Sequence, residues 1–331
     1  MSPSMEASTF QVPTIDILPF LRNPKSAESQ KVIAATREAC RSTGFFQVVG
    51  HGLSPSLKSR FFEASQRFFA LSPGEKMKLD ARTTVGRRGY DVLESQSYHA
   101  GTPPDLKEGF YVGHDLPMDA DRIKAARFFE GVNVWPDSEV LAHHDFRDHV
   151  EEYFEVIHAL ALNMLDLIQC TLPYGPDIFR QFTAGSTVSV LRLLHYPRAP
   201  PEEPSGGDKQ QLGAGAHTDF GAITLLIQDE NAGLEVLNSE TNEFVAIDPT
   251  PNALVFNVGD MLSFWTGGEY KSSVHRVINK ASRDRYSAAF FYDGNLDCPL
   301  TPWNQKDRPA EGSGALTVEK HMKKRIAASY G

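Results

Sequence analysis

Three side chains of the types that bind a catalytic metal stand at two places in the second half of the sequence. His217 and Asp219 are one residue apart in AGAHTDFGAITLL, and His275 follows in YKSSVHRVIN. A lone His-x-Asp pair is more often a turn, or a core histidine beside a surface carboxylate. Two histidines and one carboxylate together, however, are the ligand set of a facial triad for non-haem Fe(II), which leaves coordination positions open for a co-substrate and O2. Catalytic zinc also takes three protein ligands, so this set alone does not select iron.

An arginine and a serine downstream of His275 predict an anion site. In RYSAAFF, strand alternation places Arg285 and Ser287 on one face together with Ala289 and Phe291. A guanidinium and a hydroxyl on an inward face need a buried anion, and a carboxylate suits both. The alternative, in which Arg285 pairs with a neighbouring Asp, is weaker because the rest of this face is apolar.

The strand-like segment LRLLHYP adds a second polar face. Alternation puts Arg192, Leu194 and Tyr196 on a common side, where Tyr196 could hydrogen-bond the same ligand. A register shift of one residue would instead put Arg192 on the surface. A cation near a metal site needs a partner. That partner is either a protein carboxylate, with Asp293 the nearest candidate, or the substrate's own carboxylate, phenolate or enolate, and we favour the substrate.

After residue 185 the sequence consists of short segments rich in Val, Ile, Phe and Tyr, separated by Gly, Asn, Asp and Pro. This pattern is typical of an antiparallel sandwich or jelly roll. The expected strands are STVSVLRLLHY, AITLLIQ, LEVLN, FVAI, ALVFNV, MLSFW, SSVHRVIN and RYSAAFFYDG. The predicted fold class is therefore α+β with a mainly β core.

The first half of the chain is mostly helical by its apolar periodicity. The expected elements are helices at 28–42, 55–71 and 140–172 and short strands at 12–17 and 45–51. Gly44 is placed to end the first of these helices. Between the second and third helices, a polar stretch punctuated by Gly carries no periodic signal.

We divide the chain into four parts, which we expect to form one cooperative unit. They are a disordered tail at 1–9, a mostly helical region at 10–184, the β core on which it packs at 185–300, and a segment at 301–331 with a closing helix. The Pro- and Gly-rich loop at 197–215 leads directly into His217. Loops of that length are often functional, so it is a candidate lid.

The composition argues against a nucleic-acid or membrane protein. The 331 residues carry a formal net charge of −9, whereas phosphate binding takes a clustered basic face. No apolar run is long enough to span a membrane. The first residues, MSPSMEASTF, lack the features of a signal peptide, and three widely spaced cysteines fit a reduced compartment. We expect a cytoplasmic protein with a small-molecule partner, as a monomer or a homodimer.

Between residues 11 and 295 the sequence resembles the Fe(II)/2-oxoglutarate-dependent dioxygenases of the isopenicillin N synthase-like family. The motifs are VPTIDI, REACRSTGFFQVVGHGLS, FFALSPGEKMKL, LRLLHYP, GAHTDFGAITLLIQDENAGLEV, VFNVGDMLSFWTGGEYKSSVHRV and RYSAAFFYDG. The resemblance implies a distorted jelly roll, also called a double-stranded β-helix, with Fe(II) held by His217, Asp219 and His275. It also implies 2-oxoglutarate as co-substrate on the iron, with its far carboxylate held by Arg285 and Ser287.

The resemblance extends to the pocket around the metal. Tyr196 matches the second Tyr of the family's Asn-Tyr-Tyr-Pro motif, which contacts the co-substrate, whereas Leu194 and His195 replace the first two residues of that motif. This departure affects the hydrogen bonding of the co-substrate near the metal. The candidates for the substrate pocket are Arg192 and Phe291, then Phe220 and Asp293, and, in the segment GRRGYD, Arg88 and Tyr90.

The resemblance implies oxidation of a small organic molecule, a specialised metabolite, by O2 and 2-oxoglutarate, with succinate and CO2 as products. The outcome is hydroxylation, desaturation or ring rearrangement, and ascorbate is a candidate reductant. One alternative is an iron oxidase that does not use 2-oxoglutarate, as in isopenicillin N synthase, where the Arg-x-Ser pair holds the substrate's carboxylate. Another is a non-catalytic small-molecule receptor on the same fold, against which the complete ligand set argues.

Overall fold

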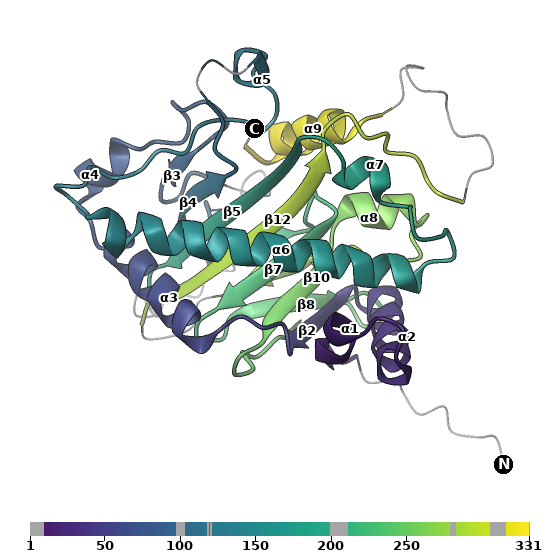
Figure 1. Cartoon of the computed structure of the whole chain (residues 1–331). Coiled ribbons are helices and arrows are strands. Elements are labelled where there is room, and N and C mark those ends of the chain that lie inside the picture. Colours follow the sequence, from purple (N-terminus) through teal and green to yellow (C-terminus); the bar gives the residue numbers. More distant parts are fainter. Residues whose placement is uncertain are drawn as a thin grey trace.

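The short apolar segments of the second half form most of two β-sheets. The computed structural model in Figure 1 describes residues 10–96, 103–117, 119, 121–198, 211–278, 283–304 and 316–330. The strands are β1 (Thr14–Asp16), β2 (Phe45–Val49), β3 (Gly89–Asp91), β4 (Glu108–Gly113), β5 (Thr187–Tyr196), β6 (Ala214–His217), β7 (Ile223–Gln228), β8 (Leu234–Asn238), β9 (Glu243–Ala246), β10 (Leu254–Val258), β11 (His275–Val277) and β12 (Arg285–Asn295). Within these residues the larger sheet has the order β1-β2-β10-β7-β12-β5-β4-β3 and the smaller β6-β11-β8-β9. This is the predicted jelly roll.

Helices pack on one side of the larger sheet. The helices of the described residues are α1 (Leu18–Arg22), α2 (Ala27–Ser42), α3 (Pro55–Phe69), α4 (Pro73–Met77), α5 (Asp121–Lys124), the 3-10 turn η1 (His143–Asp145), α6 (Arg147–Thr171), α7 (Arg180–Thr183), α8 (Asp260–Trp265) and α9 (Val318–Tyr330), and not all of them lie on that side. Figure 1 shows α6 crossing the face of the sheet, with α3 and α2 beside it. The buried residues of α6 recur at helical spacing, which gives this helix the apolar stripe that covers a sheet.

The central strand β12 separates the helical core from the other side of the sheet. It pairs antiparallel with β5 on one side and β7 on the other. Phe290 and Tyr292 belong to the core under α6, where the rings of Phe290 and Phe154 meet edge to face at 5.6 Å. Phe291, between them in sequence, points to the opposite side, where it lines a cavity. The two faces of one strand thus serve packing and binding separately.

The N-terminal helices form where the sequence predicts them. The helix expected at 28–42 is α2, and the oxygen of Ser26 caps it by accepting a hydrogen bond from the backbone of Ser29 at 3.1 Å. Gly44 ends it with φ +69°, and a Cβ there would lie 1.8 Å from the carbonyl oxygen of Lys271. Glycine is required at this position both by the backbone conformation and by the close approach of the chain.

The prediction of a strand at MLSFW is wrong, because this segment forms α8. Gly259 precedes the helix and Asp260 lies in its first turn, where a carboxylate is favourable. Met261, Leu262 and Trp265 are buried while Phe264 is 43% exposed, a helical rather than an alternating pattern. The prediction was wrong because it rested on the number of apolar residues in this segment and not on their spacing.

The N-terminal region contributes strands as well as helices. β1 and β2 form at the two predicted strands and extend the larger sheet at one edge, whereas β3 and β4 extend it at the other edge within the stretch that carried no periodic signal. β4 pairs with β5 from Glu108 opposite His195 to Gly113 opposite Val190. The region at 10–184 therefore completes the sheet as well as covering it.

Two predictions lie outside the described residues. The tail at 1–9 is one of them, and most of the candidate lid, residues 199–210, is the other. Among the described residues, no helix combines the length and the apolar character needed to cross a bilayer. The cysteines are free thiols, as expected.

Candidate active site

The three predicted metal ligands meet at one edge of the smaller sheet. His217 ends β6 and His275 begins β11, and the antiparallel register pairs them directly. Asp219 lies in the loop after β6, with Oδ1 3.7 Å from Nε2 of His275 and 3.9 Å from Nε2 of His217. The three ligand atoms all lie within 4.8 Å of one another. The His-x-Asp spacing brings a strand residue and a loop residue to one point.

Backbone carbonyl groups orient both imidazoles. Nδ1 of His217 is 2.7 Å from the carbonyl oxygen of Gly215, and Nδ1 of His275 is 3.2 Å from that of Ser273. Because a carbonyl oxygen only accepts, each Nδ1 carries the proton and each Nε2 presents its lone pair. Burial, together with the adjacent His275, lowers the pKa of His217 and keeps its imidazole neutral, which is the form that binds a metal.

Two neighbouring strands hold the carboxylate of Asp219. Its Oδ2 accepts hydrogen bonds from Oγ1 of Thr224 at 2.6 Å and from Nδ2 of Asn257 at 2.7 Å, so Oδ1 is the oxygen left facing the histidines. Burial alone would raise the pKa of Asp219, but His275 and His217 and these two donors outweigh it and lower the pKa. Sequence reasoning missed both donors, whose signal is a polar residue inside an otherwise apolar strand.

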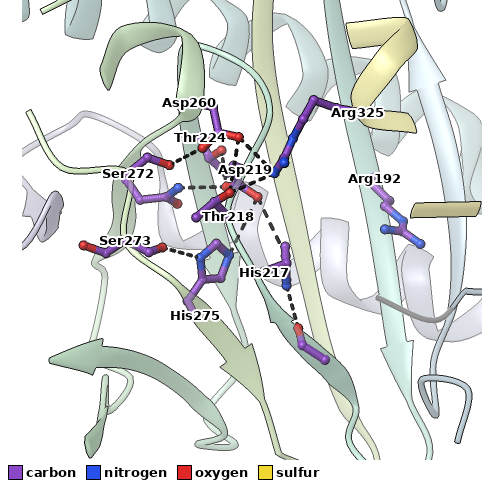
Figure 2. A network of polar contacts seen from close by, with 12 residues as sticks. Arg192, His217, Thr218, Asp219, Thr224, Asp260, Ser272, Ser273, His275 and Arg325 are labelled. Carbon is purple, nitrogen blue, oxygen red and sulfur yellow. Dashed lines mark hydrogen bonds and ion pairs between the residues drawn. The ribbon is translucent and has the colours of Figure 1, made fainter. Parts of the chain in front are cut away.

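Asp260 joins the ligand loop to two distant segments (Figure 2). Its Oδ2 accepts from Thr218 at 3.2 Å and pairs with Arg325 of α9 at 2.9 Å, and its Oδ1 accepts from Ser272 at 2.7 Å. Arg325 also donates to Oγ1 of Thr218 at 2.9 Å. One carboxylate thus connects the residue before Asp219, the approach to β11 and the C-terminal helix.

This donor set fits Fe(II). Two neutral imidazoles and one carboxylate oxygen are the protein ligands of non-haem iron sites, and they leave its other coordination positions open. The second oxygen of Asp219 is already engaged, so the acid offers a single oxygen. The open side faces a cavity of about 130 Å³ that His217, Asp219 and His275 help to line.

The two predicted strand faces line this cavity. They contribute Val190, Arg192, Leu194 and Tyr196 from β5, and Arg285, Ser287, Ala289 and Phe291 from β12. The antiparallel register places Arg285 opposite Tyr196 and Ser287 opposite Leu194. The alternation argument and its register are therefore confirmed on both strands.

Arg285 is buried without a carboxylate partner among the described residues. It donates to the backbone oxygen of Asn231 at 3.1 Å, to Oε1 of Gln228 at 2.9 Å and to Oγ of Ser287 at 3.4 Å. Its guanidinium lies 5.0 Å from the ring centroid of Tyr196. Every one of these partners is neutral, so the positive charge still needs an anion. The far carboxylate of 2-oxoglutarate fits that requirement, and a neighbouring Asp does not supply it.

The expectation that Arg192 awaits the substrate's anion is wrong, because a protein carboxylate already pairs with it. Its Nη2 donates to Oδ2 of Asp91 and to Oε1 of Gln96 at 3.2 Å, and its guanidinium lies 5.0 Å from the ring centroid of Tyr111. The side chains of the ion pair are 8% and 5% exposed. The partner comes from β3 and is not Asp293. Arg192 does line the cavity, but with its charge balanced.

A second buried ion pair at the cavity was missed by sequence reasoning. Lys107 lines the cavity and pairs with Asp105, whose Oδ1 accepts from the backbone nitrogen of Gly215 at 2.8 Å. Burial, partly offset by Asp105, lowers the pKa of Lys107 to about 8. Asp105 therefore connects Lys107 to Gly215 of β6, which lies two residues before His217. The segment around them has no periodic pattern that could have placed it.

The remaining pocket candidates divide into two groups. Phe220, Phe291 and Asp293 line the cavity, whereas Arg88 and Tyr90 do not. Arg88 is buried and donates to the backbone oxygen of Phe129 at 2.6 Å.

Tyr90 is likewise occupied within the protein. Its hydroxyl donates to Oε2 of Glu108 at 2.6 Å. The same carboxylate binds Lys76 at 2.7 Å and His195 at 2.8 Å. The assignment of Arg88 and Tyr90 to the substrate is wrong, because internal hydrogen bonds hold both side chains away from the cavity.

Comparisons with known proteins agree with this geometry. Residues 187–294 match the 2OG-Fe(II) oxygenase superfamily, and residues 12–138 match the N-terminal region of the non-haem dioxygenase in morphine synthesis. The 2-oxoglutarate-dependent dioxygenase citB of Monascus ruber is 48% identical over 99% of this chain and 98% of its own. Clavatol oxidase claD of Penicillium crustosum is 48% identical over 99% of both chains.

Solved structures agree as well. A full-length Neurospora crassa protein in complex with alpha-KG and thymine covers 99% of both chains, with a TM-score of 0.80 and 25% sequence identity. Relatives named 2-oxoglutarate-dependent dioxygenases favour that activity over the oxidase and receptor alternatives. The chain belongs to the 2OG-Fe(II) oxygenase superfamily and is a non-haem Fe(II)/2-oxoglutarate-dependent dioxygenase.

Proposed function

We propose that the protein hydroxylates a C–H bond of a small, flat, partly unsaturated ring compound of specialised metabolism. The observation that carries the proposal is the aromatic character of the cavity wall. It is formed by Phe45, Tyr111, Phe128, Phe129, Phe220 and Phe291. Aromatic rings prefer to stack on or meet the edge of other rings, so a wall of this composition favours a planar ligand.

The names of relatives support the same class of substrate. One relative is a clavatol oxidase, and solved structures of the Neurospora crassa protein hold thymine or 5-formyluracil with alpha-KG. Thymine and 5-formyluracil are flat rings that differ in the oxidation state of one exocyclic carbon. A ring that carries an oxidisable carbon substituent is therefore the substrate that we favour here.

The residues of the cavity divide the work of binding. Arg285 and Ser287 hold the far carboxylate of 2-oxoglutarate, and Tyr196 packs against the Arg285 guanidinium. His217, Asp219 and His275 would hold Fe(II), which activates O2 when bound. The aromatic wall orients the ring and keeps water from the reacting carbon. In the overall reaction the substrate C–H becomes C–OH, and 2-oxoglutarate and O2 become succinate and CO2.

Succinate formation tests this proposal. The protein with Fe(II), 2-oxoglutarate and O2 would be given clavatol, thymine, 3-methylphenol and, as a saturated control, 3-methylcyclohexanol. We expect at least one flat ring to raise succinate above the substrate-free rate and to yield a product one oxygen heavier, while the saturated ring does neither. Equal stimulation by 3-methylcyclohexanol, or none by any flat ring, would contradict the proposal.

A further inference from the structure

Asp293 occupies an irregular position in the central strand β12. The pairing of β12 with β5 shifts register between Tyr292, opposite Ser189, and Gly294, opposite Val188, so Asp293 is the extra residue of a β-bulge. Gly294 has φ +66°, a conformation that glycine adopts without strain. Bulges locally re-aim a side chain and are common beside active sites. This one directs a carboxyl group to the wall of the cavity.

In the part of the chain that the structure describes, the carboxyl group of Asp293 is buried and has no protein partner. The residue is 2% exposed, and Oδ1 has no hydrogen bond. Among the described residues, no hydrogen bond or ion pair reaches either of its oxygens. Its close neighbour is the backbone of Gly221, where a Cβ would lie 2.3 Å from Oδ1. Burial and the nearby charge of Asp219 raise its pKa to about 7. A carboxyl group in such a place is unfavourable unless something bonds to it.

The other acidic groups around the cavity are already satisfied. Asp91 pairs with Arg192, Asp105 pairs with Lys107, and Asp219 faces the metal position. Asp293 differs from all of them in presenting acceptor oxygens without a partner among the described residues, in the cavity that Phe291 also lines. A ring that packs against Phe291 would bring its own substituents within reach of this carboxyl group.

We propose that Asp293 is a substrate-recognition residue that accepts a hydrogen bond from an O–H or N–H donor on the ring. The inference rests on the proposed function and narrows it, because the substrate must then carry a donor group as well as an oxidisable carbon. A site built around a substrate donor discriminates strongly against the analogue that lacks it, since the buried acceptor is then left unpaired.

Binding without turnover tests the assignment. The probes are 3-methylphenol, which has a hydroxyl donor, and 3-methylanisole, in which a methyl group replaces the hydroxyl hydrogen. Each would be titrated calorimetrically into the protein loaded with Fe(II) and 2-oxoglutarate under anaerobic conditions. We expect the wild type to prefer the phenol by roughly ten-fold to a hundred-fold. Asp293→Leu should abolish that preference, and Asp293→Asn, which keeps an acceptor oxygen, should retain part of it.

Thermal unfolding separates recognition from a structural role. Because Asp293 has no partner to lose among the described residues, Asp293→Asn should melt at or above the wild-type temperature without ligand. A lower melting temperature for Asp293→Asn, equal affinities of the wild type for the two probes, or no measurable binding of either would overturn the assignment. Preferential phenol binding without oxidation of any flat ring would refute the proposed function alone. Oxidation of rings without a hydroxyl preference would refute the role of Asp293 alone.

Discussion

The hydrogen bond from Thr224 to Asp219 predicts a specific weakening of metal binding in Thr224→Val. Valine has nearly the same shape as threonine, so the change removes the donor of a 2.6 Å bond and leaves the packing intact. Thr224 is 3% exposed, and water cannot readily replace its hydroxyl. Asn257 remains as the second donor at 2.7 Å, so Asp219 keeps one of its two anchors.

The magnitude follows from the kind of bond that is lost. A hydrogen bond to a charged group contributes about 1.5–3 kcal/mol, which sets the expected loss in the free energy of unfolding. Loss of a group that orients a metal ligand typically weakens metal affinity by about ten-fold to a hundred-fold. We expect a further loss in the double variant Thr224→Val/Asn257→Leu, because no donor then holds Oδ2 of Asp219.

The assay is anaerobic equilibrium dialysis against Fe(II), paired with urea unfolding of the metal-free protein. Thr36→Val is the matched control. Thr36 is also fully buried, but its hydroxyl lies in α2 and has no hydrogen-bond partner. The Thr36→Val variant should therefore change Fe(II) affinity by less than about two-fold, since it removes no hydrogen bond to a metal-binding residue. A folded Thr224→Val protein with wild-type Fe(II) affinity would refute the reasoning.

Three further perturbations test other contacts. His275→Ala should abolish 2-oxoglutarate turnover while circular dichroism stays native, and retained turnover with Fe(II) would contradict its role as a ligand. Arg285→Leu should raise the KM for 2-oxoglutarate by roughly thirty-fold to several thousand-fold, because the far carboxylate of the co-substrate loses its counter-ion. The KM for the ring substrate should change far less. An unchanged KM for 2-oxoglutarate would disprove the role of Arg285 as its anchor. Asp91→Asn should lower the free energy of unfolding by about 3–5 kcal/mol in urea, since it breaks the buried pair with Arg192. A free energy of unfolding equal to that of the wild type would contradict a stabilising role for the Asp91–Arg192 ion pair.

Sequence periodicity predicted the parts of the site that lie on long regular strands. Alternation along β5 and β12 placed Tyr196, Arg285 and Ser287 correctly on the cavity face, because a strand that pairs on both sides has little freedom of register. The metal ligands were predictable for a related reason. Histidine and aspartate are rare in apolar surroundings, and His217 and Asp219 are so near in sequence that the chain keeps them near in space.

Partners from distant segments were not predictable in this way. Arg192 and Asp91 are 101 residues apart, and β3 has too few residues for a periodic signal. The less favoured alternative, in which Arg192 pairs with Asp293, followed strand alternation, which the bulge at Asp293 interrupts. The assignment of Arg88 to the substrate pocket came from the resemblance of GRRGYD to the family's substrate loop, and it is wrong because the guanidinium donates to the carbonyl oxygens of Gly86 and Phe129 instead.

The carboxylate of Asp260 connects the C-terminal helix to the loop that carries the metal ligand Asp219. Through Asp260, Arg325 of α9 and Thr218 of the ligand loop share one set of hydrogen bonds, although they are 107 residues apart in the chain (Figure 2). Two events that depend on the same contacts are thermodynamically linked, and the coupling is reciprocal. Ordering of the ligand loop around a metal would therefore stabilise the docked helix, and undocking of the helix would loosen the loop by the same free energy. Met322 and Ile326 of α9 also line the cavity, so the same helix contacts both the pocket and, through Arg325, the loop that carries Asp219.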